Sequence, residues 1–279
     1  MELAENDLAK IDLGVHVDGY ISFQAHTVLV GRDESKPLEG PLADAYHCAW
    51  TIAEVVGRMA KPGGSSAELQ EAVNSVADAF GVNVYSGSTL HQVKRFVPDA
   101  TKKVSLSSHH EAAKSEKCEF EAGEVYAIDL AVTTGEGKQK DGKHRTTVFR
   151  RRVETKYALK NKASRVLLNE INDMCPSLCF SMRMFKDEAA AKMGIRELDA
   201  HALVEPYKVM YEEKDSQVVH VKYTILLLPS GNIKVTGLPL PANINSEKVS
   251  NLPAAITELL ASTSLEKKKK VRSKKKKTG

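Results

Sequence analysis

Apolar and polar residues alternate near the start of the chain, in the stretch "KIDLGVHVDGYISFQAHT" at residues 10–27. Alternation with a period of two is typical of a β-strand with one buried face. The Asp18-Gly19 dipeptide is a strong signal for a two-residue hairpin turn. The pattern therefore predicts a β-hairpin whose first strand buries one row of apolar side chains, namely Ile11, Leu13, Val15 and Val17.

Helical and strand patterns follow this hairpin. Apolar residues recur at helical spacing over residues 42–60, where "KPGG" ends the run, and over residues 66–80, where Gly81 follows. Strands are expected within residues 82–97, 125–133 and 217–237, the last with a turn at Pro229-Ser230-Gly231, and a short helix at residues 253–261. This order predicts an α+β domain built on antiparallel sheet. Residues 161–215 interrupt it with two helical patterns, which predict a helical insertion.

The distribution of charge changes this picture at the C-terminus. The formal net charge is +4, but residues 267–277 contain nine cations and no acid, so subtracting nine leaves −5 for residues 1–266. Such a run is expected to be disordered and to attract nucleic acid or another polyanion. The predicted nucleic-acid-binding residues are Lys267, Lys268, Lys269, Lys270, Arg272, Lys274, Lys275, Lys276 and Lys277.

Composition excludes two classes of protein. No stretch approaches the roughly 20 apolar residues of a membrane helix, and the acidic start "MELAENDLAK" is not a secretory signal. Four cysteines in 279 residues form no disulfide framework, which favours a reducing, intracellular compartment.

The motifs "IDLGVHVDG", "AHT", "EVYAID", "TTGEGK" and "RTT" occur in this order. They resemble the methionine aminopeptidase and creatinase-like family, which has the pita-bread fold, and more narrowly its proliferation-associated, or ErbB-receptor-binding, proteins. The resemblance implies an aminopeptidase-like domain over residues 1–265, a type II-like insertion at about residues 161–215 and a basic tail at 266–279. It also implies that the N-terminal part of the fold is missing, which would leave a sheet edge and an apolar face exposed.

Active members of this family hold two metal ions with two Asp, one His and two Glu side chains. By resemblance the Asp positions fall on Asp12 and Phe23, the His position on His91, and the Glu positions on Asp129 and Lys222. Carboxylates that bridge two cations offset their repulsion, and the metal pair activates a water molecule.

Lys222 is incompatible with such a metal pair. An ammonium about 4 Å from a divalent ion repels it by about 8 kcal/mol at an effective dielectric constant of 20. Phe23 has no ligating atom, and the family's second active-site His would fall near Asp99, where no His stands. We therefore expect no catalytic residue, metal or cofactor, and we expect the Lys222 ammonium to pair with Asp12 or Asp129, because buried acids need a partner.

The resemblance implies a non-catalytic protein that binds RNA and large ribosomal subunits and regulates growth, translation or ribosome biogenesis. It implies a monomer in the cytoplasm, nucleus and nucleolus, with DNA or regulatory proteins as further partners. A tail without aromatic residues would make electrostatic, sequence-tolerant contacts. The alternative function is a residual metallo-aminopeptidase that removes N-terminal Met, with one metal held by Asp12, Asp129 and His91.

Overall fold

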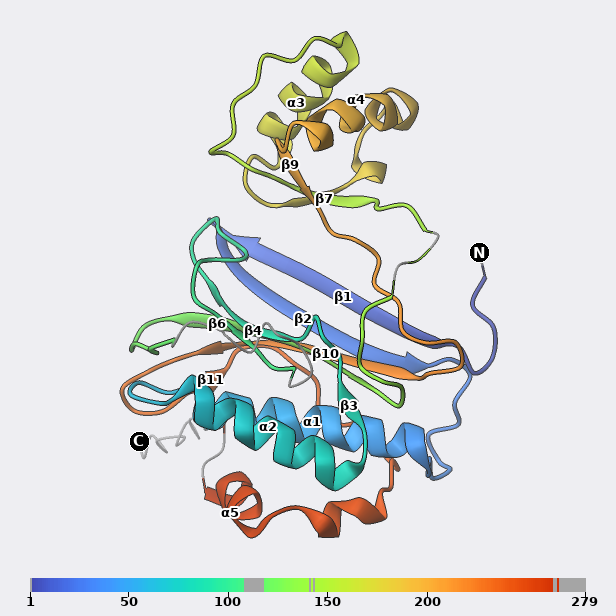
Figure 1. The fold of residues 1–279 in the computed structure, drawn as a ribbon, viewed down its shortest axis with the longest axis vertical. Helices are drawn as coiled ribbons and strands as arrows, with labels where there is room; N and C mark the ends of the chain where they lie inside the picture. Colours follow the sequence, from blue (N-terminus) through green and yellow to red (C-terminus); the bar gives the residue numbers. More distant parts are fainter. Residues whose placement is uncertain (1, 108–117, 141, 143, 263–264, 266–279) are drawn as a thin grey trace, which may run out of the picture.

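The computed structural model describes residues 2–107, 118–140, 142, 144–262 and 265. An eight-stranded antiparallel sheet forms the body, in the order β1-β2-β10-β6-β4-β5, with β11 paired to β10 and β3 paired to β6 (Figure 1). Its strands are β1 (Leu8–Val17), β2 (Tyr20–Leu29), β3 (Asn83–Val84), β4 (Thr89–Val93), β5 (Lys103–Ser105), β6 (Val125–Thr133), β10 (Val218–Leu226) and β11 (Ile233–Lys234).

Helices α1 (Pro41–Met59) and α2 (Ser66–Phe80) cover one face of this sheet (Figure 1). The Ser65 side chain caps α2 by accepting a hydrogen bond from the Glu68 backbone, and Gly81 ends it in the left-handed conformation with φ 61°. The main core lies between these helices and the strands. The helix α5 (Ala254–Ser262) packs on α1, and the 3₁₀ turn η3 (Glu247–Asn251) packs on α2. None of the described helices is long and apolar enough to cross a membrane.

The insertion forms a second small unit with its own core (Figure 1). It consists of α3 (Lys162–Met174), η2 (Met182–Met184), α4 (Glu188–Ala200) and a three-stranded sheet of β7 (Val148–Arg151), β8 (Cys179–Ser181) and β9 (Val204–Pro206). Both predicted helices are present. The strand β7 precedes the expected range of residues 161–215, yet its Phe149 belongs to the same core.

The N-terminal hairpin has the predicted turn, because Asp18 and Gly19 both have positive φ, 52° and 81°. The predicted burial of the apolar row on β1 is wrong. Its four side chains remain 49–75% exposed. The reason is that β1 is the outermost strand, whereas α1 packs on β6 and β10.

Candidate functional site

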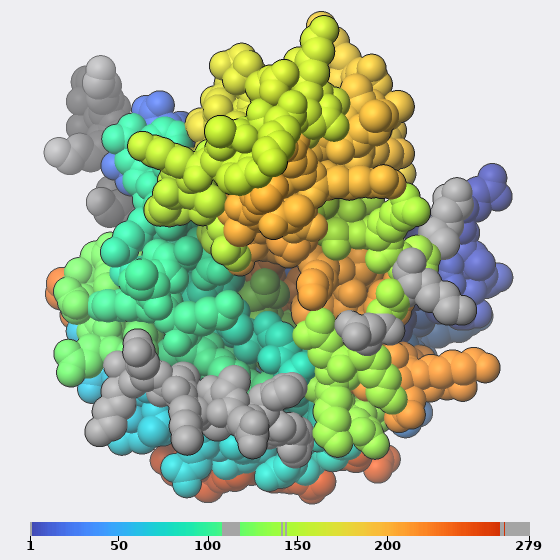
Figure 2. Space-filling model, turned by 45° about the horizontal axis from the view of Figure 1, so that its top comes forward, coloured from blue at the N-terminus to red at the C-terminus, as the bar shows by residue number. Residues whose placement is uncertain are grey.

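A cavity of about 1010 Å³ lies between the insertion and the sheet face opposite α1. In Figure 2 the surface is hollowed below the insertion. The five positions assigned by resemblance all line this cavity, together with insertion residues such as Cys179 and Met184. The family resemblance therefore identified residues that the fold brings together from five strands and 211 residues of chain, from Asp12 to Lys222.

Strand register places the charged side chains in one row across the sheet. On β10, Lys222 lies opposite Asp129 of β6 on one side and opposite Ala25 of β2 on the other. Ala25 in turn lies opposite Asp12 of β1. Paired residues in a sheet point to the same face. The methyl group of Ala25 is short, so the long Lys222 side chain can pass over it to reach Asp12.

The Lys222 ammonium binds both acids. Its Nζ lies 2.6 Å from Asp12 Oδ2 and 2.9 Å from Asp129 Oδ2, and its side chain is 12% exposed. Burial lowers the pKa of Lys222, but the negative charges of Asp129 and Asp12 outweigh it and raise the pKa overall. The ammonium therefore stays charged, and the predicted pairing is confirmed with both acids.

His220 is a further member of this cluster, which the sequence-based reasoning missed. Its Nε2 lies 2.7 Å from Asp129 Oδ1, so Asp129 is held on both oxygens. Burial raises the pKa of Asp129, but the hydrogen bond from His220 and the charge of Lys222 outweigh it and lower the pKa well below the ordinary range. The available signal was the two-residue spacing from Lys222, since alternate residues of a strand share a face.

The other two positions form an apolar contact instead of a ligand pair. The rings of Phe23 and His91 lie 6.3 Å apart, nearly edge to face. His91 is 9% exposed, its Nδ1 shares a 3.2 Å hydrogen bond with Thr89 Oγ1, and burial lowers its pKa. The Lys222 Nζ lies 5.6 Å from the centre of the Phe23 ring. Burial and the neighbouring Phe23 ring therefore favour the neutral form of His91.

These residues do not fit the metal pair of active family members. The ammonium of Lys222 lies within hydrogen-bonding distance of both remaining acids, in the space that a shared cation would need. Across the described part of the chain, no group of three or more His, Cys, Asp or Glu side chains is arranged to hold a metal ion. The alternative function requires one metal ion held by Asp12, Asp129 and His91. The Lys222 ammonium binds two of these three side chains, Asp12 and Asp129, and so occupies the place of that metal as well.

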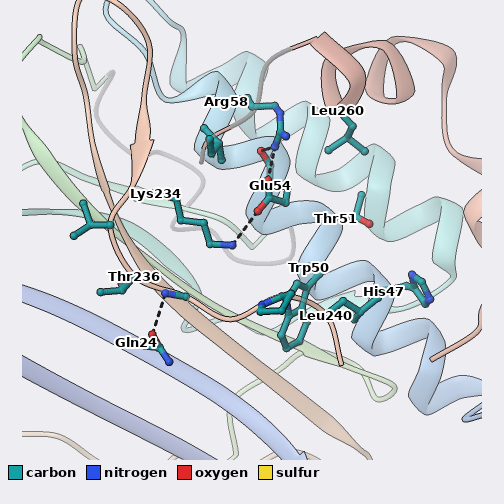
Figure 3. A pocket seen from close by; sticks show the side chains of 14 residues that line it. Gln24, His47, Trp50, Thr51, Glu54, Arg58, Lys234, Thr236, Leu240 and Leu260 are labelled. Atoms are coloured by element: carbon teal, nitrogen blue, oxygen red, sulfur yellow. Dashed lines mark hydrogen bonds and ion pairs between the residues drawn. The ribbon is translucent and has the colours of Figure 1, made fainter. Parts of the chain in front are cut away.

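A second pocket, of about 820 Å³, lies on the helix side of the sheet, between α1 and the segment after β11. Figure 3 shows Glu54 bound to Arg58 and to Lys234, at 2.5 and 3.1 Å. Leu265 also lines this pocket, and its carbonyl accepts a 2.9 Å hydrogen bond from the Lys234 backbone. The nine tail cations at residues 267–277 lie outside the described residues.

The chain is similar in sequence to a known protein family and to individual proteins. The family model "Metallopeptidase family M24" matches residues 1–158. Proliferation-associated protein A of Dictyostelium discoideum is 37% identical, over 93% of this chain and 67% of that protein. ERBB-3 binding protein 1 of Solanum tuberosum is 36% identical, over 99% of this chain and 70% of that protein.

A solved structure gives the same fold. The structure of a thermophilic Arx1 superposes with a TM-score of 0.81 and 24% sequence identity, covering 96% of this chain and 76% of the other. The fold is thus the predicted pita-bread fold, with mixed helices and sheet. The chain belongs to metallopeptidase family M24, and within it to the group of proliferation-associated and ERBB-3-binding proteins.

Proposed function

We propose that this protein is a non-catalytic member of family M24 that works by binding. The observation that carries the proposal is the Lys222 ammonium between Asp12 and Asp129. Hydrolysis in the family needs a metal pair that activates water and stabilises the oxyanion. An ammonium bound to both acids cannot activate the attacking water molecule as a metal does, because it offers no open coordination position for water.

The proposed partners are RNA and the large ribosomal subunit. One support is the run of nine cations that follows Leu265, since clustered Lys and Arg side chains gain affinity by releasing counterions from phosphates. A second support is a cationic stretch at the start of the insertion. Residues 144–165 contain eight Lys or Arg against a single acid, Glu154. Six of these cations are exposed: Arg145, Arg152, Lys156, Lys160, Lys162 and Arg165.

The names of the relatives add the cellular context. They associate those proteins with proliferation and with ERBB-3. For this chain we accordingly propose a role in growth control through translation or ribosome biogenesis, in the cytoplasm, nucleus and nucleolus. A fluorescent fusion with and without residues 267–279 tests the location. Loss of nuclear signal on truncation is expected, and a signal confined to the cytoplasm in both forms would contradict it.

Co-sedimentation with purified large ribosomal subunits across a salt series tests the binding function. The full chain is expected to sediment at low salt, and each phosphate contact should contribute about −0.7 to the slope of log K against log salt. Removal of residues 267–279 should make that slope less negative while leaving weaker binding through the body.

A variant of the folded body separates the contribution of residues 144–165 to binding from that of the tail at residues 267–277. Changing Arg152, Lys156 and Lys160 to Gln should weaken binding without altering the contribution of the tail. The control changes three exposed cations elsewhere, Lys36, Lys138 and Lys186, to Gln, and is expected to bind as the native chain does. Absence of binding at every salt concentration would refute the proposed partner.

A further inference from the structure

Only two hydroxyl side chains of this chain follow an arginine by three positions. They are Ser35, which follows Arg32, and Thr155, which follows Arg152. Protein kinases select substrates by the charge pattern around the hydroxyl, and basophilic kinases select an arginine at this position. Both residues are therefore candidate phosphorylation sites by sequence, and their surroundings in the structure decide between them.

At the first candidate, the fold already uses both the hydroxyl and the arginine. The Ser35 hydroxyl donates a 2.6 Å hydrogen bond to Asp33 Oδ1. The Arg32 guanidinium donates to the backbone carbonyls of Ala242 and Asn243, at 2.6 and 2.9 Å. A kinase would therefore meet a bound arginine with an acid beside the hydroxyl, which excludes Ser35.

The second candidate, Thr155, lies between β7 and α3, in a largely exposed segment without helix or strand. Its side chain is partly exposed, and its hydroxyl has no hydrogen-bond partner among the described residues. The Arg152 side chain is 45% exposed. Glu205 lies 3.6 Å from it but is bound more closely by Arg150, at 2.5 Å. Both the hydroxyl and the selecting arginine are therefore accessible here.

The backbone of this segment is nevertheless held in place. Arg151 donates to the Thr155 carbonyl at 3.3 Å, and Arg165 donates to the carbonyls of Leu159 and Lys160, both at 2.9 Å. The guanidinium groups thus fix the main chain on either side of the hydroxyl. Because no helix or strand has to open, a kinase can reach this surface loop in the folded protein.

We propose that Thr155 is a phosphorylation site of a basophilic protein kinase, and that its phosphate weakens RNA binding by residues 144–165. ATP supplies the phosphoryl group. A bond forms between Thr155 Oγ1 and the γ-phosphorus as the bond to the β,γ-bridging oxygen breaks, ADP leaves, and the hydroxyl proton passes to the catalytic Asp of the kinase. The effect on binding rests on the proposed function, whereas the modification itself does not.

The phosphate changes the charge in the middle of this cationic stretch. Residues 144–165 contain eight cations and one acid, a formal charge of +7, which a phosphate of about −2 lowers to about +5. Arg151, Arg152 and Lys156 are close neighbours of Thr155 in the chain, so its phosphate competes with RNA phosphates for them. Loss of two RNA contacts makes the slope of log K against log salt less negative by about 1.4, or weakens binding about 25-fold at about 0.1 M salt.

Mass-spectrometric site mapping tests the modification without any RNA. The full 279-residue chain is incubated with ATP and the catalytic subunit of cAMP-dependent protein kinase, which is basophilic. Phosphate is expected on Thr155 and not on Ser35. The variant Arg152→Gln should lower the incorporation at Thr155 at least tenfold. An unmodified Thr155, or equal incorporation in Arg152→Gln, would overturn the proposal.

Fluorescence anisotropy with a labelled oligouridylate tests the effect on binding. Kinase treatment should raise the Kd of the native chain about 25-fold more than that of Thr155→Val, which controls for phosphate placed elsewhere. An equal change in both chains, or no binding by the untreated chain, would overturn the regulatory effect. Since this probe contains no ribosome, a failure to bind large subunits would refute the proposed partner and leave this result standing.

Discussion

Replacing Lys222 with Met tests whether the ammonium holds the site together. Methionine keeps most of the length of the side chain but removes the charge, so Asp12 and Asp129 lose the cation that binds them at 2.6 and 2.9 Å. Two carboxylates then face each other across the short Ala25, without the ammonium between them.

The magnitude follows from the burial of the three groups. Breaking a fully buried ion pair by removing one partner costs about 3–5 kcal/mol. Asp12 is 42% exposed and therefore contributes little after screening by solvent. Asp129 is 31% exposed and keeps its hydrogen bond from His220. We therefore expect Lys222→Met to lower the free energy of unfolding by about 2 kcal/mol at pH 7.

Urea unfolding followed by the fluorescence of Trp50 measures this change, since Trp50 is the single tryptophan and is 8% exposed in the core. The control Lys36→Met, at a side chain 79% exposed, should stay within about 0.5 kcal/mol of the native chain. Asp129→Asn should destabilise the native chain but stabilise the Lys222→Met variant. A Lys222→Met variant as stable as the control would refute the reasoning.

Two further predictions concern the loss of stability at low pH and the packing of α1 at Gly57. The lowered pKa of Asp129 stabilises the fold above its unfolded-state pKa of about 3.8, and this contribution is lost as pH falls through the folded-state pKa. Asp129→Asn should therefore flatten the loss of stability below pH 3.8, measured by Trp50 fluorescence, and an unchanged acid limb would contradict it. Gly57→Ala places a Cβ 2.6 Å from Leu265 Cδ1 and 3.0 Å from Tyr223 Oη, so overpacking of about 1–3 kcal/mol should exceed the helix-propensity gain of about 1 kcal/mol. A higher urea midpoint would contradict that result.

The local elements could be predicted from the sequence for physical reasons, whereas the cluster of site positions came from the family resemblance. Turn chemistry at Asp18-Gly19 and the stop at Gly81 are local, and both are present. The pairing of Lys222 followed from charge once the family resemblance had placed it beside two acids, because a buried ammonium and two acids leave few alternatives.

Other features depended on long-range packing. Alternation in β1 identifies its apolar face but not whether another layer covers that face, so the burial of Val15 and Val17 was mispredicted. His220 was missed because its partner Asp129 lies on a neighbouring strand 91 residues away, and only the register of β10 against β6 brings them together.

The central claim is that the site around Lys222 holds no catalytic metal ion. Calorimetric titration with Mn²⁺ and Co²⁺ tests it most directly, with the native chain compared with the double variant Phe23→Asp, Lys222→Glu. This variant restores acids at both altered ligand positions. The account predicts no specific binding to the native chain and a gain of binding in the variant. Stoichiometric binding to the native chain that Asp12→Ala abolishes, with cleavage of a Met-peptide, would contradict it.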